Sequence, residues 1–220
     1  YLNIYTCLLI IYIMNGLYIN LSHRTDRKKN IENLKQKYTF FQNIERFDAI
    51  LNKRGDIGCA LSHIKCLTQL LNQNKDYYLI MEDDFFIMND DDFQNFEASF
   101  QVIKDNDDWD VLTLTPRGDT IIKNYLLDFN KVVNNQTATC YIVKHNFIEI
   151  LLSYFKKGVL GLMNNEDPNI NALDQCWKPL QHIHNFIYYQ SIFAGQLQGY
   201  SDIEQKNVNY NERFIQQIHY

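Results

Sequence analysis

Cysteine is scarce in this chain, with five residues among 220, and their spacing is wide. The number is odd and no CxxC pair occurs, so the sequence indicates neither a disulfide framework nor a zinc site. We interpret these residues as buried thiols in a reducing compartment: Cys7, Cys59, Cys66, Cys140 and Cys176. This interpretation predicts a cytoplasmic protein and leaves the secretory pathway and a membrane-proximal location as alternatives.

A surplus of positive charge is also missing. The chain has 21 Lys and Arg residues against 26 Asp and Glu residues, which gives a net charge of −5. Proteins that bind nucleic acid usually carry a basic face, so this balance predicts that nucleic acid is not a partner. One small basic cluster either meets a phosphate group or forms a solvated helix face: Arg24, Arg27, Lys28 and Lys29.

No apolar run reaches the length of a membrane span. The segment Tyr1 to Ile13 is uncharged and rich in Leu and Ile, but a spanning helix needs about 20 apolar residues. Membrane association is therefore unsupported, with an anchor stub as the alternative for this segment. We leave it out of the fold prediction and expect a single domain over residues 14–220, whose oligomeric state the sequence does not indicate.

Strand-like and helix-like runs alternate along the rest of the chain. The strand-like runs are 17–21, 47–50, 77–81, 111–114, 137–143 and 186–189. Helical periodicity marks residues 31–38, 57–71 (with Asp56 as N-cap), 93–103 and 147–155, and a short helix is expected over 172–180. This alternation predicts an α/β fold with a mostly parallel sheet covered by helices on both faces. We expect loops over residues 115–130 and 164–171.

Three consecutive carboxylates, Glu82, Asp83 and Asp84, follow the apolar run 77–81 and precede Phe85. Carboxylates this close together repel one another, and an apolar frame makes their charge more costly, so a divalent cation would stabilise them. Hard oxygen ligands suit Mg²⁺ or Mn²⁺. The alternative is a solvated turn after a buried strand.

Three separate stretches together resemble glycosyltransferase family 25, which includes lipopolysaccharide sugar transferases and collagen hydroxylysine galactosyltransferases. They are residues 18–27 (YINLSHRTDR), 58–63 (GCALSH) and 79–84 (LIMEDD), in the family's order and spacing. The resemblance runs from about Leu17 to Tyr200. It implies a GT-A fold with a Rossmann-like sheet, a UDP-hexose donor substrate, and Mn²⁺, with Mg²⁺ as the alternative ion.

The resemblance also assigns residues to the donor substrate. Asn20, Arg24 and Arg27 would lie at the nucleotide end, where Arg27 on a first helical turn suits a diphosphate. For Arg27 a surface arginine beside Asp26 is the alternative. The remaining substrate-binding candidates are Gly58, Ser62, His63, Glu82 and Asp83, and for His63 a structural histidine is an equal alternative.

In such acidic motifs the last acid normally ligates the metal, so the resemblance makes Asp84 the first metal candidate. Glu82 is the second, and Asp202 in a Ser-Asp-Ile segment is the candidate from the C-terminal part, ahead of His182 and His184. Family 25 enzymes are regarded as inverting, which implies one in-line displacement assisted by a general base. Asp174 is the candidate base, and a helix N-cap is its alternative role.

These inferences together predict a metal-dependent hexosyltransferase that moves galactose or glucose from UDP to a hydroxyl of a glycan or a hydroxylysine. A catalytically inactive family member that binds carbohydrate or acts in adhesion is the alternative from another class. A metal-dependent phosphohydrolase would also use clustered acids, but it does not account for residues 18–27 or 58–63. Release of UDP with and without Mn²⁺ distinguishes the three.

Overall fold

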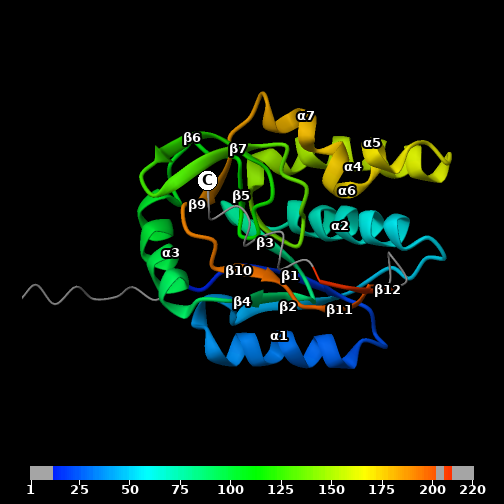
Figure 1. Cartoon of the computed structure of the whole chain (residues 1–220), viewed down its shortest axis with the longest axis horizontal. Helices are drawn as coiled ribbons and strands as arrows, with labels where there is room; N and C mark the ends of the chain where they lie inside the picture. Colours follow the sequence, from blue (N-terminus) through cyan, green and yellow to red (C-terminus); the bar gives the residue numbers. More distant parts are fainter. Residues whose placement is uncertain (1–11, 202–205, 210–220) are drawn as a thin grey trace, which may run out of the picture.

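The computed structural model describes residues 12–201 and 206–209, and a mixed eight-stranded sheet forms its centre (Figure 1). The strand order is β2-β1-β3-β8-β5-β9-β7-β6. These strands are β1 (Asn15–Asn20), β2 (Asn43–Asp48), β3 (Tyr77–Glu82), β5 (Val111–Thr113), β6 (Asp119–Leu126), β7 (Phe129–Val133), β8 (Cys140–Lys144) and β9 (Phe186–Tyr189). Two small sheets pair β4 (Phe85–Ile87) with β10 (Ala194–Gln196), and β11 (Gly199–Ser201) with β12 (Lys206–Val208).

Most strands of the large sheet run in one direction. β1 is parallel to both β2 and β3, and β5 is parallel to β9. β8 lies antiparallel between β3 and β5, and β7 lies antiparallel between β9 and β6, so these two of the eight described strands point the other way. The predicted α/β class with a mostly parallel sheet is confirmed.

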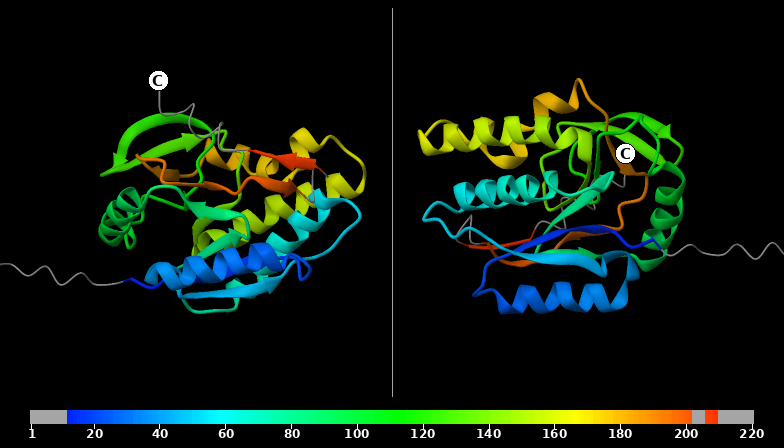
Figure 2. Two further views of the ribbon diagram at one scale, coloured as in Figure 1. Left: turned by 60° about the horizontal axis from the view of Figure 1, so that its bottom comes forward. Right: turned by 180° about the vertical axis from the view of Figure 1, so that it is seen from behind.

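Helices cover both faces of the sheet, as expected (Figure 2). The helices are α1 (Thr25–Lys37), α2 (Gly55–Leu71), α3 (Asp90–Ile103), α4 (Ile148–Met163), α5 (Pro168–Asn171), α6 (Leu173–Cys176) and α7 (Lys178–Gln181). Side chains of β3 alternate between two cores: Tyr78 and Ile80 join the core under α2 and α4, while Leu79 and Met81 join the core under α1 and α3. This alternation buries β3 on both sides and fixes its register.

The loop predicted over residues 115–130 is wrong, because β6 and the start of β7 form an edge hairpin there. The first six residues of β6 are exposed, so no apolar alternation marks the strand. Asn124 and Leu127 take positive φ angles of 48° and 52°, and the register shifts twice, which blurs the pattern further. The loop expected over 164–171 likewise contains α5, and β8 begins at Cys140, after the predicted start at residue 137.

Asp56 does not cap α2 from the N-cap position. That position is Arg54, whose side chain makes no cap hydrogen bond. Asp56 lies within the first turn of the helix, where its carboxylate accepts from the Ile57 N–H at 2.8 Å and pairs with Arg54 at 2.7 Å. The acid still complements the positive end of the helix dipole.

Four cysteines fall among the described residues, and all four are free thiols: Cys59, Cys66, Cys140 and Cys176. Within the same described ranges, no helix combines the length and the apolar character that crossing a bilayer requires.

Candidate active site

One cavity of about 670 Å³ lies at the carboxyl ends of β1 and β3. The two strands are parallel and pair Ile19 with Glu82, so the residues that follow them meet at one edge of the sheet. Ligands of open α/β sheets bind at such an edge. The cavity wall contains eight of the predicted site residues: Arg27, Gly58, Ser62, His63, Glu82, Asp83, Asp84 and Asp174.

Asn20 and Arg24 support this cavity from outside its wall. The Asn20 amide donates to Asp83 Oδ2 at 2.7 Å, and its Oδ1 accepts from Arg46 Nε at 2.9 Å. Asn20 therefore orients the second acid of the triplet. Arg24 pairs with Asp26 at 3.0 Å and donates to the Tyr200 carbonyl at 3.2 Å. Asp202, the third metal candidate, lies outside the described residues.

Arg27 bridges the acidic triplet. Its Nη1 lies 3.0 Å from Asp83 Oδ1 and 3.2 Å from Asp84 Oδ2, and its Nη2 donates to the Tyr200 carbonyl at 2.9 Å. All three side chains are largely buried, with exposed fractions of 15%, 10% and 10%. The guanidinium thus offsets part of the repulsion within the triplet, and it lies in the cavity wall where a diphosphate would be within its reach.

Asp84 is the acid whose environment most favours an added cation. The side chain is largely buried, and its Oδ1 is buried with no hydrogen-bond partner among the described residues. Burial, followed by the charge of Glu82, raises the pKa of Asp84 to about 7, while Arg27 and a hydrogen bond from Gln196 to the carboxyl act in the opposite direction. Burying an oxygen without a hydrogen-bond partner costs free energy. A carboxylate oxygen is a ligand that hard divalent cations prefer. The residues present therefore fit the metal that the acidic triplet predicts.

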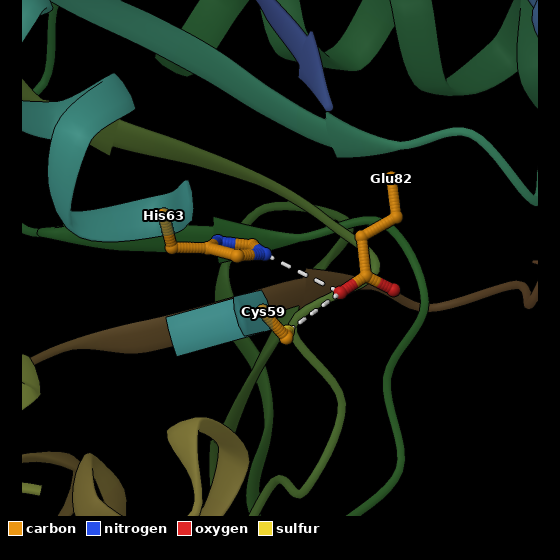
Figure 3. A group of neighbouring side chains, drawn as sticks. All are labelled: Cys59, His63 and Glu82. Atoms are coloured by element: carbon orange, nitrogen blue, oxygen red, sulfur yellow. Dashed lines mark hydrogen bonds and ion pairs between the residues drawn. The ribbon is translucent and has the colours of Figure 1, made fainter. Parts of the chain in front are cut away.

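Glu82 points toward α2 and contacts two of its side chains (Figure 3). His63 Nε2 lies 3.3 Å from Glu82 Oε1, and Cys59 Sγ lies 3.5 Å from the same oxygen. Thr139 lies 3.5 Å from Oε2. Burial opposes ionisation of Glu82, but His63, the hydrogen bond with Cys59 and the charge of Arg27 together lower the pKa of the carboxyl. Glu82 is therefore ionised at pH values at which Asp84 is still partly protonated.

Ser62 and Gly58 hold the loop that contains Ile50, between β2 and α2, beside the cavity. The Ser62 hydroxyl donates to the Gly58 carbonyl at 2.7 Å and accepts from the Ile50 N–H at 2.8 Å, so its proton is already engaged. A Cβ at Gly58 would lie 2.6 Å from the Ile50 carbonyl oxygen. The close approach that glycine permits is therefore to the chain's own loop, and the two residues shape the wall of the cavity.

Asp174 lies on α6 and lines the same cavity as the acidic triplet. It follows Leu173 in the first turn, where no side-chain cap is made, so the alternative role of N-cap does not hold. Burial raises the pKa of its carboxyl, while hydrogen bonding to Gln175 acts in the opposite direction. A carboxylate with a raised pKa in a cavity wall has the properties of a general base.

Two other predicted candidates lie away from this cavity. His182 and His184 follow α7 and are not on a strand. His184 packs edge-to-face against Phe147, and His182 lies 3.4 Å from Asn134.

A second hollow of about 510 Å³ beside α3 contains a single acid, Asp128, which accepts a hydrogen bond from the Ser99 hydroxyl at 2.6 Å. The cluster of titratable groups is at the first cavity.

A family model for glycosyltransferase family 25 (LPS biosynthesis protein) matches residues 53–217. The chain belongs to glycosyltransferase family 25. The matched range includes residues 58–63, the acidic triplet and Asp174, whereas residues 18–27 precede it. No curated protein matches the chain.

Solved structures of three other enzymes are similar to this family 25 chain. A glycosyltransferase involved in the glycosylation of the major capsid of PBCV-1 has a TM-score of 0.50 and 10% identity, over 94% of this chain and 100% of that chain. Mannose-1-phosphate geranyltransferase from Thermus thermophilus has a TM-score of 0.43 and 8% identity, over 81% and 60% of the two chains. UDP-glucose pyrophosphorylase complexed with UDP-glucose has a TM-score of 0.37 and 12% identity, over 90% of this chain and 72% of that chain. The first of these supports the GT-A-like fold alone.

Asp84 predicts a pH-dependent stability of the family 25 protein without metal. Its pKa is about 7 in the folded chain and about 4 when unfolded, so between these values only the folded state holds the proton, and stability falls as pH rises. Asparagine cannot ionise, so Asp84→Asn is expected to gain up to about 3 kcal/mol relative to wild type between pH 5 and pH 8. Thermal unfolding in chelator at both pH values measures this difference.

The exposed Asp91 provides the control, because Asp91→Asn makes the same chemical change outside the cavity. Its stability relative to wild type should be the same at both pH values. A constant difference between wild type and Asp84→Asn over this range would contradict the raised pKa.

Proposed function

We propose that the chain transfers a hexose, galactose or glucose, from a UDP-sugar to a hydroxyl group of a glycan or a hydroxylysine by metal-assisted inverting displacement. One observation carries the proposal: the partnerless Oδ1 of Asp84 belongs to the same cavity wall as Glu82, Asp83 and Asp174. Membership in family 25 supports the reaction class. The volume of about 670 Å³ lies within the range of about 300–1,000 Å³ that small-molecule sites occupy.

The acidic triplet and Arg27 form the donor side of the site in this proposal. Asp84, with Glu82, would hold Mn²⁺ or Mg²⁺, which supplies charge neutralisation for the departing diphosphate. Asp83, which Asn20 and Arg27 hold in place, would bind the ribose or sugar hydroxyls. Arg27 contributes a second positive charge for the diphosphate. Orienting groups of this kind act by positioning the donor before reaction.

Asp174 forms the acceptor side. An acceptor hydroxyl is a poor nucleophile at neutral pH, so a carboxylate within hydrogen-bond reach must take its proton during attack. In an inverting displacement, the acceptor oxygen forms its bond to the anomeric carbon as the bond to the diphosphate breaks. The proton of the hydroxyl passes to the Asp174 carboxylate, and no covalent sugar–enzyme intermediate forms. Water access through the open cavity then allows Asp174 to lose that proton again.

The proposal is tested by incubating the protein with UDP-galactose or UDP-glucose, Mn²⁺, and either a lipooligosaccharide or a hydroxylysine-containing collagen peptide. We expect UDP release that depends on both metal and acceptor, and a product heavier than the acceptor by one hexose in mass spectrometry. Binding of carbohydrate without UDP release would instead indicate a binding module. Release of phosphate from donors and unrelated phosphate esters alike would indicate a hydrolase.

A further inference from the structure

A cysteine, a histidine and a glutamate converge on one point of the cavity wall. Cys59 and His63 are four residues apart on α2, so both side chains leave the same face of the helix. Glu82 at the end of β3 points toward them (Figure 3). The three ligand atoms all lie within 4.8 Å of one another. We propose that these three side chains form a Zn²⁺ site, which shares Glu82 with the cation site proposed at Asp84.

Two of the three separations between the ligand atoms match those around a tetrahedral zinc ion. Zinc binds sulfur at about 2.3 Å and imidazole nitrogen or carboxylate oxygen at about 2.0–2.2 Å. At tetrahedral angles these bond lengths place nitrogen about 3.4 Å from oxygen, and sulfur about 3.6 Å from oxygen. The structure has 3.3 Å between His63 Nε2 and Glu82 Oε1, and 3.5 Å between Cys59 Sγ and the same oxygen. The third pair, the sulfur and the imidazole nitrogen, lies within 4.8 Å, so the site closes around an ion once these two atoms are about 3.6 Å apart.

The chemical types of the three ligands select zinc over manganese. A thiolate and an imidazole are the softer ligands that zinc takes, whereas Mn²⁺ and Mg²⁺ prefer carboxylate oxygens such as those of Asp84. The two cation sites therefore differ in chemistry, although Glu82 is a ligand in both. When zinc binds, the proton of the Cys59 thiol and the proton between His63 Nε2 and Glu82 pass to solvent, and the sulfur and the nitrogen take the metal.

The surroundings of His63 also suit a metal ligand. Its other ring nitrogen, Nδ1, lies 3.2 Å from the hydroxyl of buried Tyr141, and its ring stacks on that tyrosine at 5.9 Å. Metal-bound histidines are usually fixed in this way by a hydrogen bond to the second nitrogen. The cluster opens on the cavity, because all three residues line it. Three protein ligands with one open position are the arrangement of zinc sites that exchange their fourth ligand.

Zinc binding is tested on the whole chain with Zn²⁺ alone, by competition with a chromogenic chelator. We expect one high-affinity ion per chain, and an affinity at least about 100-fold lower in Cys59→Ala, since even residues behind a metal ligand change affinity by about 10–100-fold. Cys176→Ala is the matched control, because this thiol hydrogen-bonds to the Leu173 carbonyl, outside the three-residue cluster. Its zinc affinity should stay within about threefold of wild type.

Cobalt substitution gives a readout that does not depend on any variant. Bound Co²⁺ should show a thiolate-to-metal charge-transfer band in wild type, and Cys59→Ala should lose it while its circular dichroism stays unchanged. If Cys59→Ala does not fold, the wild-type spectrum alone decides. The proposal is overturned if no such band forms, if wild type binds no zinc, or if Cys59→Ala binds zinc as tightly as wild type.

A second measurement rests on the proposed transfer reaction. Zinc would hold the Glu82 carboxylate, which the transfer mechanism assigns to the donor side. Zinc at concentrations near that of the enzyme should therefore inhibit UDP release by wild type more strongly than by Cys59→Ala. If neither protein releases UDP under any condition, the proposed function fails, while the zinc titration and the cobalt spectrum still judge the metal site by themselves.

Discussion

Replacing Asp84 with asparagine is expected to lower Mn²⁺-dependent UDP release from a UDP-hexose by at least about 1,000-fold, because a bound metal supplies several kcal/mol of charge stabilisation and each 1.36 kcal/mol is about a factor of ten. The physical reason is the partnerless Oδ1 of this side chain, which is buried in the cavity wall. An amide there supplies no negative charge, so the ion loses its principal ligand. Steady-state UDP release at saturating donor, followed through a Mn²⁺ titration, measures the loss.

Asp91→Asn is again the matched control, since this exposed acid lies at the start of α3, outside the cavity. It should keep the rate of wild type. Calorimetry with Mn²⁺ and UDP should show binding heat for wild type and Asp91→Asn, and none for Asp84→Asn. Full activity of Asp84→Asn would remove this residue from the metal site.

The Asp174→Asn variant is expected to keep donor and metal binding and to lose transfer by about 100- to 10,000-fold, the contribution typical of a general base. Its side chain is nearly the same size as the wild-type one, so the wall of the cavity is preserved. Burial raises the pKa of Asp174, and a rate profile in wild type should therefore rise through a pKa above the usual aspartate value. Single-turnover transfer to a saturating acceptor isolates this step.

Glu166→Gln makes the corresponding change at an exposed position shortly after α4, and it should leave transfer unaltered. Calorimetry with UDP and Mn²⁺ separates a missing base from a damaged donor site. Intact transfer by Asp174→Asn would show that another group takes the proton. Loss of UDP affinity together with transfer would place Asp174 on the donor side.

The elements that can be predicted from the sequence are those with a one-sided or doubly buried apolar pattern. The run Tyr77 to Met81 is apolar throughout because β3 is covered on both faces. Phe93, Phe96 and Phe100 recur at helical spacing, and all three are buried residues of α3. The edge hairpin escapes such prediction because most of β6 is exposed, so its residues follow no apolar pattern.

The cavity illustrates what local sequence can and cannot predict. The acidic triplet stands out because charge follows directly on an apolar strand, and the structure brings it together with Arg27 and Asp174. The contact of Cys59 with Glu82 depends on how α2 packs beside β3, which no local pattern specifies. The spacing of Cys59 and His63, four residues apart on a predicted helix, is the signal that the sequence offers for it.

The Tyr200 carbonyl accepts N–H groups from both Arg24 and Arg27, so a residue late in the chain is fastened to the first helix of the fold. Arg27 also pairs with Asp83 and Asp84, so its hydrogen bond to Tyr200 lies next to the acidic residues of the cavity wall. A protein shortened to end at residue 198 would keep every strand of the large sheet. It would lose the two hydrogen bonds to the Tyr200 carbonyl. It would also lose the part of the cavity wall to which Ser201 and Val208 contribute.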